Sequence, residues 1–298
     1  MEEANKPSEY LITRLIKLSG YSAIFFVVLI IIFLLTEGLP AITQIPLVNM
    51  LGRRWYPIED YYGLLPLIAG SLIVTIGAMI IAMPIGLGTA IYIAEVAPRW
   101  AREILKPLVE VLAGIPSVVL GFLGILVLSP YLRRLLNLPT GLTAFTGALL
   151  LAAISIPTIV SIAEDALDAV PRSYRDAALA IGATDWQTIW RVTLPAARSG
   201  VLTAVMLGVG RSIGETMTVM MVTGNAPIIP SSLSSFFSPV RTMTATIAAE
   251  MGEVATDSTH YHVLFLIGIV LFLISLVVNL IATAVISRQR KRTERILS

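Results

Sequence analysis

The sequence predicts an all-α membrane protein that crosses the bilayer six times. Of its 298 residues, 56% are hydrophobic and only 13% are charged, a composition that excludes an ordinary water-soluble domain. Six apolar segments also have close to the roughly 20 residues that a helix needs to cross the bilayer. These segments are residues 18–35, 64–82 with an expected helical extension to 94, 108–128, 142–163, 200–222 and 263–286.

The distribution of Lys and Arg residues predicts how these segments are oriented. With the N-terminus in the cytoplasm, the inner segments hold 15 Lys and Arg residues, and the outer segments hold only 5. Positive residues are retained on the cytoplasmic side, so we expect both termini to be cytoplasmic. The outer residues are Arg53, Arg54, Arg133, Arg134 and Arg241.

The first three segments contain signals for their ends and their interruptions. No small-residue cleavage site follows the first apolar run, so we expect a retained first span that doubles as the targeting signal. The second run is too long for one perpendicular span, and Pro84, Gly86 and Gly88 predict a kink or break near its inner end. Pro116 in the third segment and Pro157 in the fourth predict bends.

The polar stretch between the fourth and fifth segments predicts a helical hairpin. Pro171 suits the start of a helix and Gly182 the position just past its end, so we expect one helix over 171–181. Thr184 and Gln187 form a capping box for a second helix. We expect this helix to end near residue 192, because Pro195 disfavours helical conformation in the residue before it.

The first helix of this hairpin has a face suited to contact with another protein. Tyr174, Ala177, Ala178 and Ile181 share that face, and its two alanines allow another surface to approach the backbone closely. On spacing alone, an ordinary hairpin between two membrane spans is an equal alternative, because cap signals occur in any helical loop.

Arg211 and Glu215 give the strongest chemical signal, because both lie inside the fifth segment. Their spacing of four residues predicts that they share one helical face. Charges at bilayer depth are unfavourable by about 2.5 to 3.5 kcal/mol on insertion scales, so such residues face a bundle interior or an aqueous path. Arginine also binds an oxyanion through two parallel hydrogen bonds. The alternative is that Arg211 pairs with Glu215 and locks the bundle.

The outer loop 223–261 and the start of the sixth segment contain further candidate functional residues. A loop of this length is usually functional or disordered, and we expect it to help receive an extracytoplasmic partner. His260 and His262 are read as two interfacial histidines rather than a metal site, because no third ligand of fitting spacing is nearby. The absence of cysteine excludes disulfides and thiolate chemistry.

The hairpin resembles the EAA loop of ABC importer permeases. Asp176, Ala177, Ala178, Gly182, Val192, Leu194 and Pro195 fall at the family's spacing. Asp176 stands where Glu is usual and Val192 where Ile is usual, and both keep charge or shape. The resemblance implies that the loop docks into a groove on a cytoplasmic ATPase, with Tyr174, Asp176, Ala177, Ala178 and Gly182 as the coupling residues.

Three further stretches resemble the PstC-type permeases of phosphate ABC importers. They are AGIPSVVLGFLG over 113–124, GRSIGETMTVMMVTGN over 210–225 and RTMTATIAAEMGEV over 241–254. The likeness covers nearly everything from about residue 64 onward. It implies a type I ABC importer permease fold, with Arg211, Glu215 and Thr216 along the substrate pathway. The segments would be a cytoplasmic N-terminus 1–17, a first helix with its outer loop 18–63, a permease core 64–286 with a coupling loop 164–199, and a basic tail 287–298.

The same resemblance implies partners and a location. The partners are a PstA-type sister permease, two copies of an ABC ATPase, an extracytoplasmic phosphate-binding protein and membrane lipid. Nucleic acid and cofactors have no place in this scheme. The chain has no phosphate-binding G-x-x-x-x-G-K-[ST] motif, so ATP hydrolysis belongs to a partner chain. The expected location is the plasma membrane of a bacterium or archaeon.

Three rival functions remain at this point. A permease for sulfate, molybdate or phosphonate would need the same arginine, since Arg211 suits any oxyanion. A passive anion channel would need the spans and Arg211, but would have no use for the cytoplasmic hairpin. A membrane-embedded enzyme lacks a Ser/His/Asp, Cys/His or metal constellation in this sequence.

Overall fold

The computed structural model describes residues 7–297, and almost all of that part of the chain is helical. It describes side chains over 12–232 and 234–284. Six helical stretches in these residues are long and apolar enough to cross a membrane, which confirms the predicted number of spans. They are Ile12–Gln44, Leu65–Val96, Ser117–Leu135, Ala144–Asp168, Asp185–Gly214 and Thr259–Ala284. The basic side chains of the predicted tail 287–298 lie outside the described ones.

Three helices form the centre of the bundle: α4 (Leu65–Ile91), α8 (Ala144–Asp168) and α11 (Leu194–Gly214). These helices pack closely around Ile159 of α8, which lies against a glycine of each of the two neighbouring helices. A Cβ atom added to Gly86 of α4 would lie 2.9 Å from Ile159 Cγ2, and one added to Gly208 of α11 would lie 2.7 Å from Ile159 Cγ1. Both glycines therefore let the neighbouring backbones approach this one side chain.

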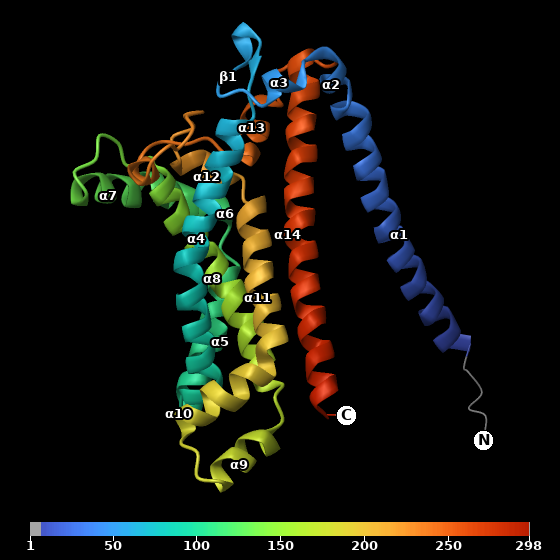
Figure 1. Ribbon diagram of the computed structural model, residues 1–298, viewed down its shortest axis with the longest axis vertical. Coiled ribbons are helices and arrows are strands. Elements are labelled where there is room, and N and C mark those ends of the chain that lie inside the picture. The colour runs from blue at the N-terminus through green and yellow to red at the C-terminus, as the bar shows by residue number, and fades with distance from the viewer. Residues whose placement is uncertain (1–6, 298) are drawn as a thin grey trace.

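The first and last helices lie at one side of this centre. α1 (Pro7–Gly38) contacts the bundle mainly through α14 (Thr259–Leu297) and leans away from the other helices toward its N-terminal end (Figure 1). The chain then forms α2 (Pro40–Gln44), α3 (Leu47–Met50) and a small antiparallel hairpin. The hairpin consists of β1 (Trp55–Tyr56), the 3-10 turn η1 (Pro57–Glu59) and β2 (Tyr61–Tyr62).

The second and third spans differ from their predictions. α4 runs through Pro84, Gly86 and Gly88 without a break, and the irregular turn comes later as the π-turn η2 (Tyr92–Val96). The expected third helix over 108–128 is divided. α5 (Arg99–Ala113) ends before Pro116, and the chain continues through α6 (Ser117–Leu123), the π-turn η3 (Gly124–Leu128) and α7 (Ser129–Leu135). Pro116, whose ψ of 133° is extended, takes the N-cap position of a new helix instead of bending an old one.

The predicted helical hairpin between the fourth and fifth spans is confirmed for its first helix, but the predicted end of its second helix near residue 192 is wrong. α9 (Arg172–Ala180) is followed by Gly182 with a φ of +88°, and the capping box of Thr184 and Gln187 opens α10 (Asp185–Thr188). Pro195 does not stop the second helix. The π-turn η4 (Ile189–Thr193) connects α10 to α11. Pro195 lies in the first turn of α11, where its missing N–H is not needed for a hydrogen bond.

The chain after α11 contains three short helices, the first of which lies within the predicted fifth segment 200–222. They are α12 (Met217–Val222), the 3-10 helix η5 (Leu233–Phe237) and α13 (Met243–Glu250). The predicted helix over 242–254 is therefore present, although it ends four residues early.

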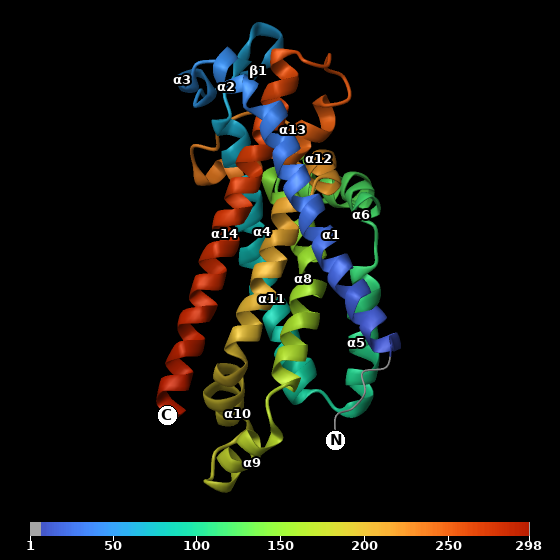
Figure 2. The same cartoon turned by 90° about the vertical axis from the view of Figure 1, so that its right-hand side faces the viewer.

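Three helix ends lie on the same side of the bundle. The beginning of α1, the end of α14 and the hairpin helix α9 lie at one end of the bundle, and β1 lies at the other (Figures 1 and 2). The two ends of the described chain and the helical hairpin thus share one side of the bundle, and the assignment of that side to the cytoplasm stays a prediction. We call the end with α9 the inner end and the end with β1 the outer end.

Candidate functional site

Arg211 lies on the last turn of α11, inside the fifth candidate span. Its side chain is exposed on the surface of this single chain, and its Nη1 donates to Thr158 Oγ1 of α8 at 3.4 Å. An arginine on a surface at this depth is unfavourable against lipid. The guanidinium therefore faces either a water-filled path or another protein chain.

Glu215 does not share a helical face with Arg211, so that prediction is wrong. α11 ends at Gly214, and Glu215 is extended, with a ψ of 126°. Its Oε1 accepts a hydrogen bond from the backbone N–H of Thr218 at 3.2 Å, in the first turn of α12. Among the described side chains, no ion pair joins Glu215 to Arg211. The carboxylate positions α12, and the guanidinium has no charged partner among the side chains that the structure describes.

The break after α11 faces the break before α6. Thr218 Oγ1 donates to Ser117 O at 3.0 Å, and Thr244 Oγ1 of α13 donates to Glu215 O at 3.0 Å. Thr216, the third predicted pathway residue, donates through Oγ1 to Gly214 O at 3.2 Å. Hydroxyl groups thus satisfy carbonyls that the broken helices leave free, as irregular backbone at membrane depth requires.

The predicted docking face on α9 is only partly open. Tyr174, Asp176 and Ala177 are exposed, and Ile181 at the end of the helix is 88% exposed. Ala178, in contrast, is only 6% exposed in this chain. It therefore contributes to packing inside the hairpin and leaves Ala177 as the alanine available to another protein.

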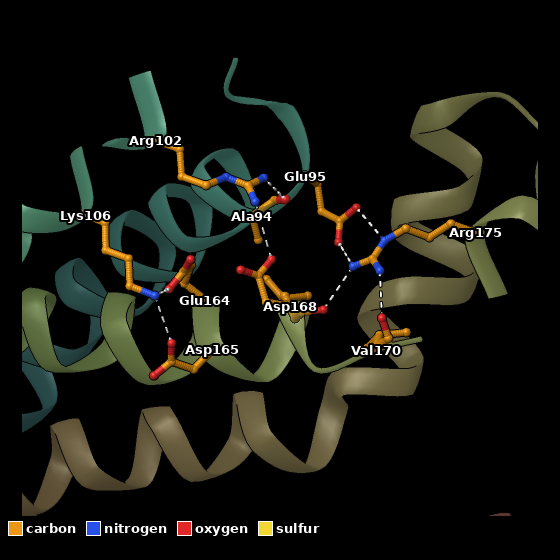
Figure 3. A network of polar contacts seen from close by, with 10 residues as sticks. Ala94, Glu95, Arg102, Lys106, Glu164, Asp165, Asp168, Val170 and Arg175 are labelled. Carbon is orange, nitrogen blue, oxygen red and sulfur yellow. Dashed lines mark hydrogen bonds and ion pairs between the residues drawn. The ribbon is translucent and has the colours of Figure 1, made fainter. Parts of the chain in front are cut away.

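A network of charged residues lies at the inner end of the bundle, directly behind α9 (Figure 3). Lys106 of α5 contacts Glu164 at 2.7 Å and Asp165 at 3.1 Å, both on α8. Arg102 of α5 contacts Asp168 of α8 at 3.7 Å and also donates to Ala94 O. These pairs hold α5 against α8.

Arg175 of α9 completes this network. Its Nε donates to Glu95 Oε2 at 3.1 Å, and its Nη2 donates to Glu95 Oε1 at 2.6 Å. The same guanidinium reaches two carbonyls at the end of α8, Val170 O at 2.8 Å and Leu167 O at 2.9 Å. The hydrogen bonds to Glu95 raise the pKa of Arg175. One side chain therefore joins α9 to the inner ends of both α4 and α8.

A second charged cluster ties three segments together at the outer end. Glu250 of α13 contacts Arg241 at 2.6 Å and His260 of α14 at 2.8 Å, and it accepts a hydrogen bond from Trp55 Nε1 at 3.2 Å. Burial by itself raises the pKa of the Glu250 carboxyl, but the hydrogen bond with His260 and the charge of Arg241 outweigh burial and hold this pKa below its usual value. The hairpin of β1 and β2 is fixed to the outer loop in this way.

The histidines take part in separate structural contacts. His260 lies against Glu250, whereas the Nδ1 atom of His262 lies 2.8 Å from the backbone oxygen of Glu37 in α1. In the described residues, no group of three or more His, Asp and Glu residues is placed to hold a metal ion.

Glu95 is a residue that the sequence interpretation missed. Its side chain is only 7% exposed, and its partner Arg175 lies in the polar hairpin 80 residues later. A lone carboxylate at the inner end of a long apolar run is a usable signal, because burial there requires a partner. The position of that partner 80 residues later has no such signal.

Comparisons with known proteins agree with this architecture. Residues 84–291 match the family model described as binding-protein-dependent transport system inner membrane component. The chain is 38% identical to the probable ABC transporter permease protein YqgH of Bacillus subtilis over 88% of this chain and 86% of that protein. It is 37% identical to the phosphate transport system permease protein PstC of Xylella fastidiosa over 80% of this chain and 78% of that protein.

Solved structures of transporters have the same fold. A chain of the bacterial alginate ABC transporter, 16% identical, superposes with a TM-score of 0.63 over 94% of this chain and 96% of its own. A chain of the MetNI methionine ABC transporter, 18% identical, superposes with a TM-score of 0.56 over 76% and 94%. The expected fold of type I ABC importer permeases is confirmed. This chain is a multi-pass plasma-membrane protein that belongs to the family of binding-protein-dependent transport system inner membrane components.

Proposed function

We propose that this chain is a permease subunit of an ATP-driven importer of inorganic phosphate. Relatives named for phosphate transport cover about four fifths of the chain at 34 to 37% identity. The observation that carries the proposal is Arg211, whose exposed guanidinium lies inside a membrane span without an acidic partner in the described chain. Arginine matches the geometry of an oxyanion and stays charged at every physiological pH.

Arg211, Glu215 and Thr216 form the pathway element of this proposal. Glu215 accepts a hydrogen bond from the backbone of Thr218 in α12, so its carboxylate serves the break and not the charge of Arg211. Arg211 receives the arriving anion, and Thr158 orients the guanidinium through its hydroxyl. Glu215 and Thr216 hold the break between α11 and α12, which lets this part of the pathway change shape.

The inner end couples these spans to ATP hydrolysis on a partner chain. Tyr174, Asp176 and Ala177 meet the ATPase, while Ala178 and Gly182 give the hairpin its shape. The complete importer contains a PstA-type sister permease, two ATPase copies and an extracytoplasmic phosphate-binding protein that docks at the outer end. This subunit catalyses no covalent step. Closure of the ATPase pair moves α9, and the spans open to the other side.

Uptake of labelled phosphate tests the proposal. The chain is reconstituted in vesicles with its sister permease, ATPase and binding protein, and uptake is measured with and without internal ATP. We expect ATP-dependent uptake that excess sulfate and molybdate do not reduce. Uptake without ATP would identify a passive channel instead.

A permease for another oxyanion is the alternative function, because Arg211 does not by itself distinguish phosphate from sulfate or molybdate. Competition by one of these anions in the same assay would move the substrate assignment to that anion. The roles of α9 and Arg211 would be unchanged.

A further inference from the structure

We propose that Arg175 is a positioning residue that transmits the movement of α9 to the inner ends of α4 and α8. This inference rests on the proposed function, because it assigns the contact through which the ATPase acts on the spans. The residues that face the ATPase are the exposed ones on α9, whereas Arg175 points to the other side, into the charged network of Figure 3.

The contact is built to hold α9 in one position. Four hydrogen bonds between 2.6 and 3.1 Å leave the guanidinium of Arg175, two to Glu95 and two to the carbonyls of Val170 and Leu167. The side chains of Arg175 and Glu95 are 20% and 7% exposed, so water competes little for these groups. The donors of an arginine form a rigid planar fork. A displacement of α9 therefore either breaks several bonds together or carries both partners along.

Glu95 connects this contact to the pathway. It lies on η2, which continues α4 without interruption, and α4 packs through Gly86 on Ile159. Ile159 also contacts Gly208 of α11, the helix that bears Arg211. Thr158, the neighbour of Ile159, holds Arg211 directly. A continuous set of close contacts thus runs from α9 to the guanidinium in the pathway.

The other ion pairs of the network do not make this link. Lys106 joins α5 to Glu164 and Asp165 on α8, and the ion pair of Arg102 joins α5 to Asp168 on α8. Neither of these ion pairs includes a residue of α9. They stabilise the surroundings of Arg175 without connecting the docking helix to α4.

The test uses the whole reconstituted importer and separates coupling from assembly. Arg175→Gln and Glu95→Gln are made singly and together, with Arg99→Gln as the control, since Arg99 is an exposed arginine of α5, outside the docking helix. Three quantities are measured: copurification of the ATPase, ATP hydrolysis without binding protein, and the stimulation of hydrolysis by phosphate-loaded binding protein. Glu95→Gln leaves both carbonyl contacts of Arg175 in place, so it is the variant least expected to disturb folding.

We expect each single variant to keep the ATPase bound and to hydrolyse ATP at the unstimulated wild-type rate. Stimulation and phosphate uptake should fall about 5- to 150-fold, the usual range of coupling between two sites. The double variant should lose no more than the worse single variant, because both changes remove the same contact. Arg99→Gln should behave as the wild type does.

Two results would overturn the inference. One is normal stimulation in Glu95→Gln, and the other is a loss of stimulation that only follows a loss of bound ATPase. A wild-type complex that neither imports phosphate nor responds to its binding protein would contradict the proposed function instead.

Discussion

At the scale of single residues, Arg211 makes the sharpest prediction. Arg211→Ala removes the charge and both parallel donors, so phosphate uptake should fall about 10- to 100-fold, given that a hydrogen bond to a charged group contributes about 1.5 to 3 kcal/mol. Arg211→Lys keeps the charge but loses the planar fork, and it should recover only part of the rate. Uptake into vesicles with matched amounts of permease measures both.

Arg133→Ala is the matched control for this prediction, because Arg133 is an exposed arginine in α7 with no ion pair in the described chain. It should transport at the wild-type rate. Normal transport by Arg211→Ala would show that this arginine serves the bundle and not the anion.

Glu250 makes a prediction about pH. Its pKa in the folded protein lies below the ordinary value, so the folded state favours the charged carboxylate. The stability that this preference gives is present above the ordinary value of 4.5 and is lost as pH falls through the lower pKa of the folded state. The melting temperature of the purified permease should therefore drop below about pH 4.5. Glu250→Gln should melt lower at neutral pH and lose part of this acid dependence.

At the scale of helices, Gly86 and Gly88 form a matched pair within α4. A Cβ atom at Gly86 meets Ile159 at 2.9 Å, whereas nothing lies within 4 Å of one at Gly88. We expect Gly86→Ala to destabilise the bundle by about 1 to 3 kcal/mol through overpacking. Gly88→Ala should be neutral or stabilising by up to about 1 kcal/mol, because alanine favours helix. Thermal unfolding in detergent compares the two, and equal effects would contradict the packing described here.

Capping residues and prolines in the sequence predicted some helix ends correctly and others wrongly, depending on whether the end is determined by neighbouring residues alone. Gly182 and the pair of Thr184 and Gln187 act within four residues, so the sequence shows the complete motif. Pro195 and Glu215 depend on what surrounds them. The π-turn η4 accommodates the proline, and contacts from Thr218 and Thr244 hold the break at Glu215. Spacing along one chain does not contain these contacts.

At the scale of the whole molecule, composition and charge predicted the number of spans and the shared side of the termini. They could not predict how distant segments meet. Trp55 and Glu250 are 195 residues apart, and Glu95 and Arg175 are 80 apart. Hydropathy indicates that Glu95, at the end of a long apolar run, needs a partner, but only the packed bundle shows that the partner is Arg175. Arg211 could be proposed as a pathway residue from the sequence, because the unfavourable free energy of a charge at bilayer depth is a property of one residue.

The orientation of the whole molecule leads to the last prediction. The chain has no cysteine, so a single introduced cysteine reports its own side of the membrane. Ile58 at the outer end is 87% exposed and Ile181 at the inner end is 88% exposed, so neither substitution disturbs the core. In right-side-out vesicles without the ATPase, a membrane-impermeant thiol reagent should label Ile58→Cys and not Ile181→Cys. Inside-out vesicles should give the reverse, and permeabilised vesicles should label both. Labelling of Ile181→Cys from outside would place α9 beyond reach of an intracellular ATPase and would overturn the coupling role assigned to it.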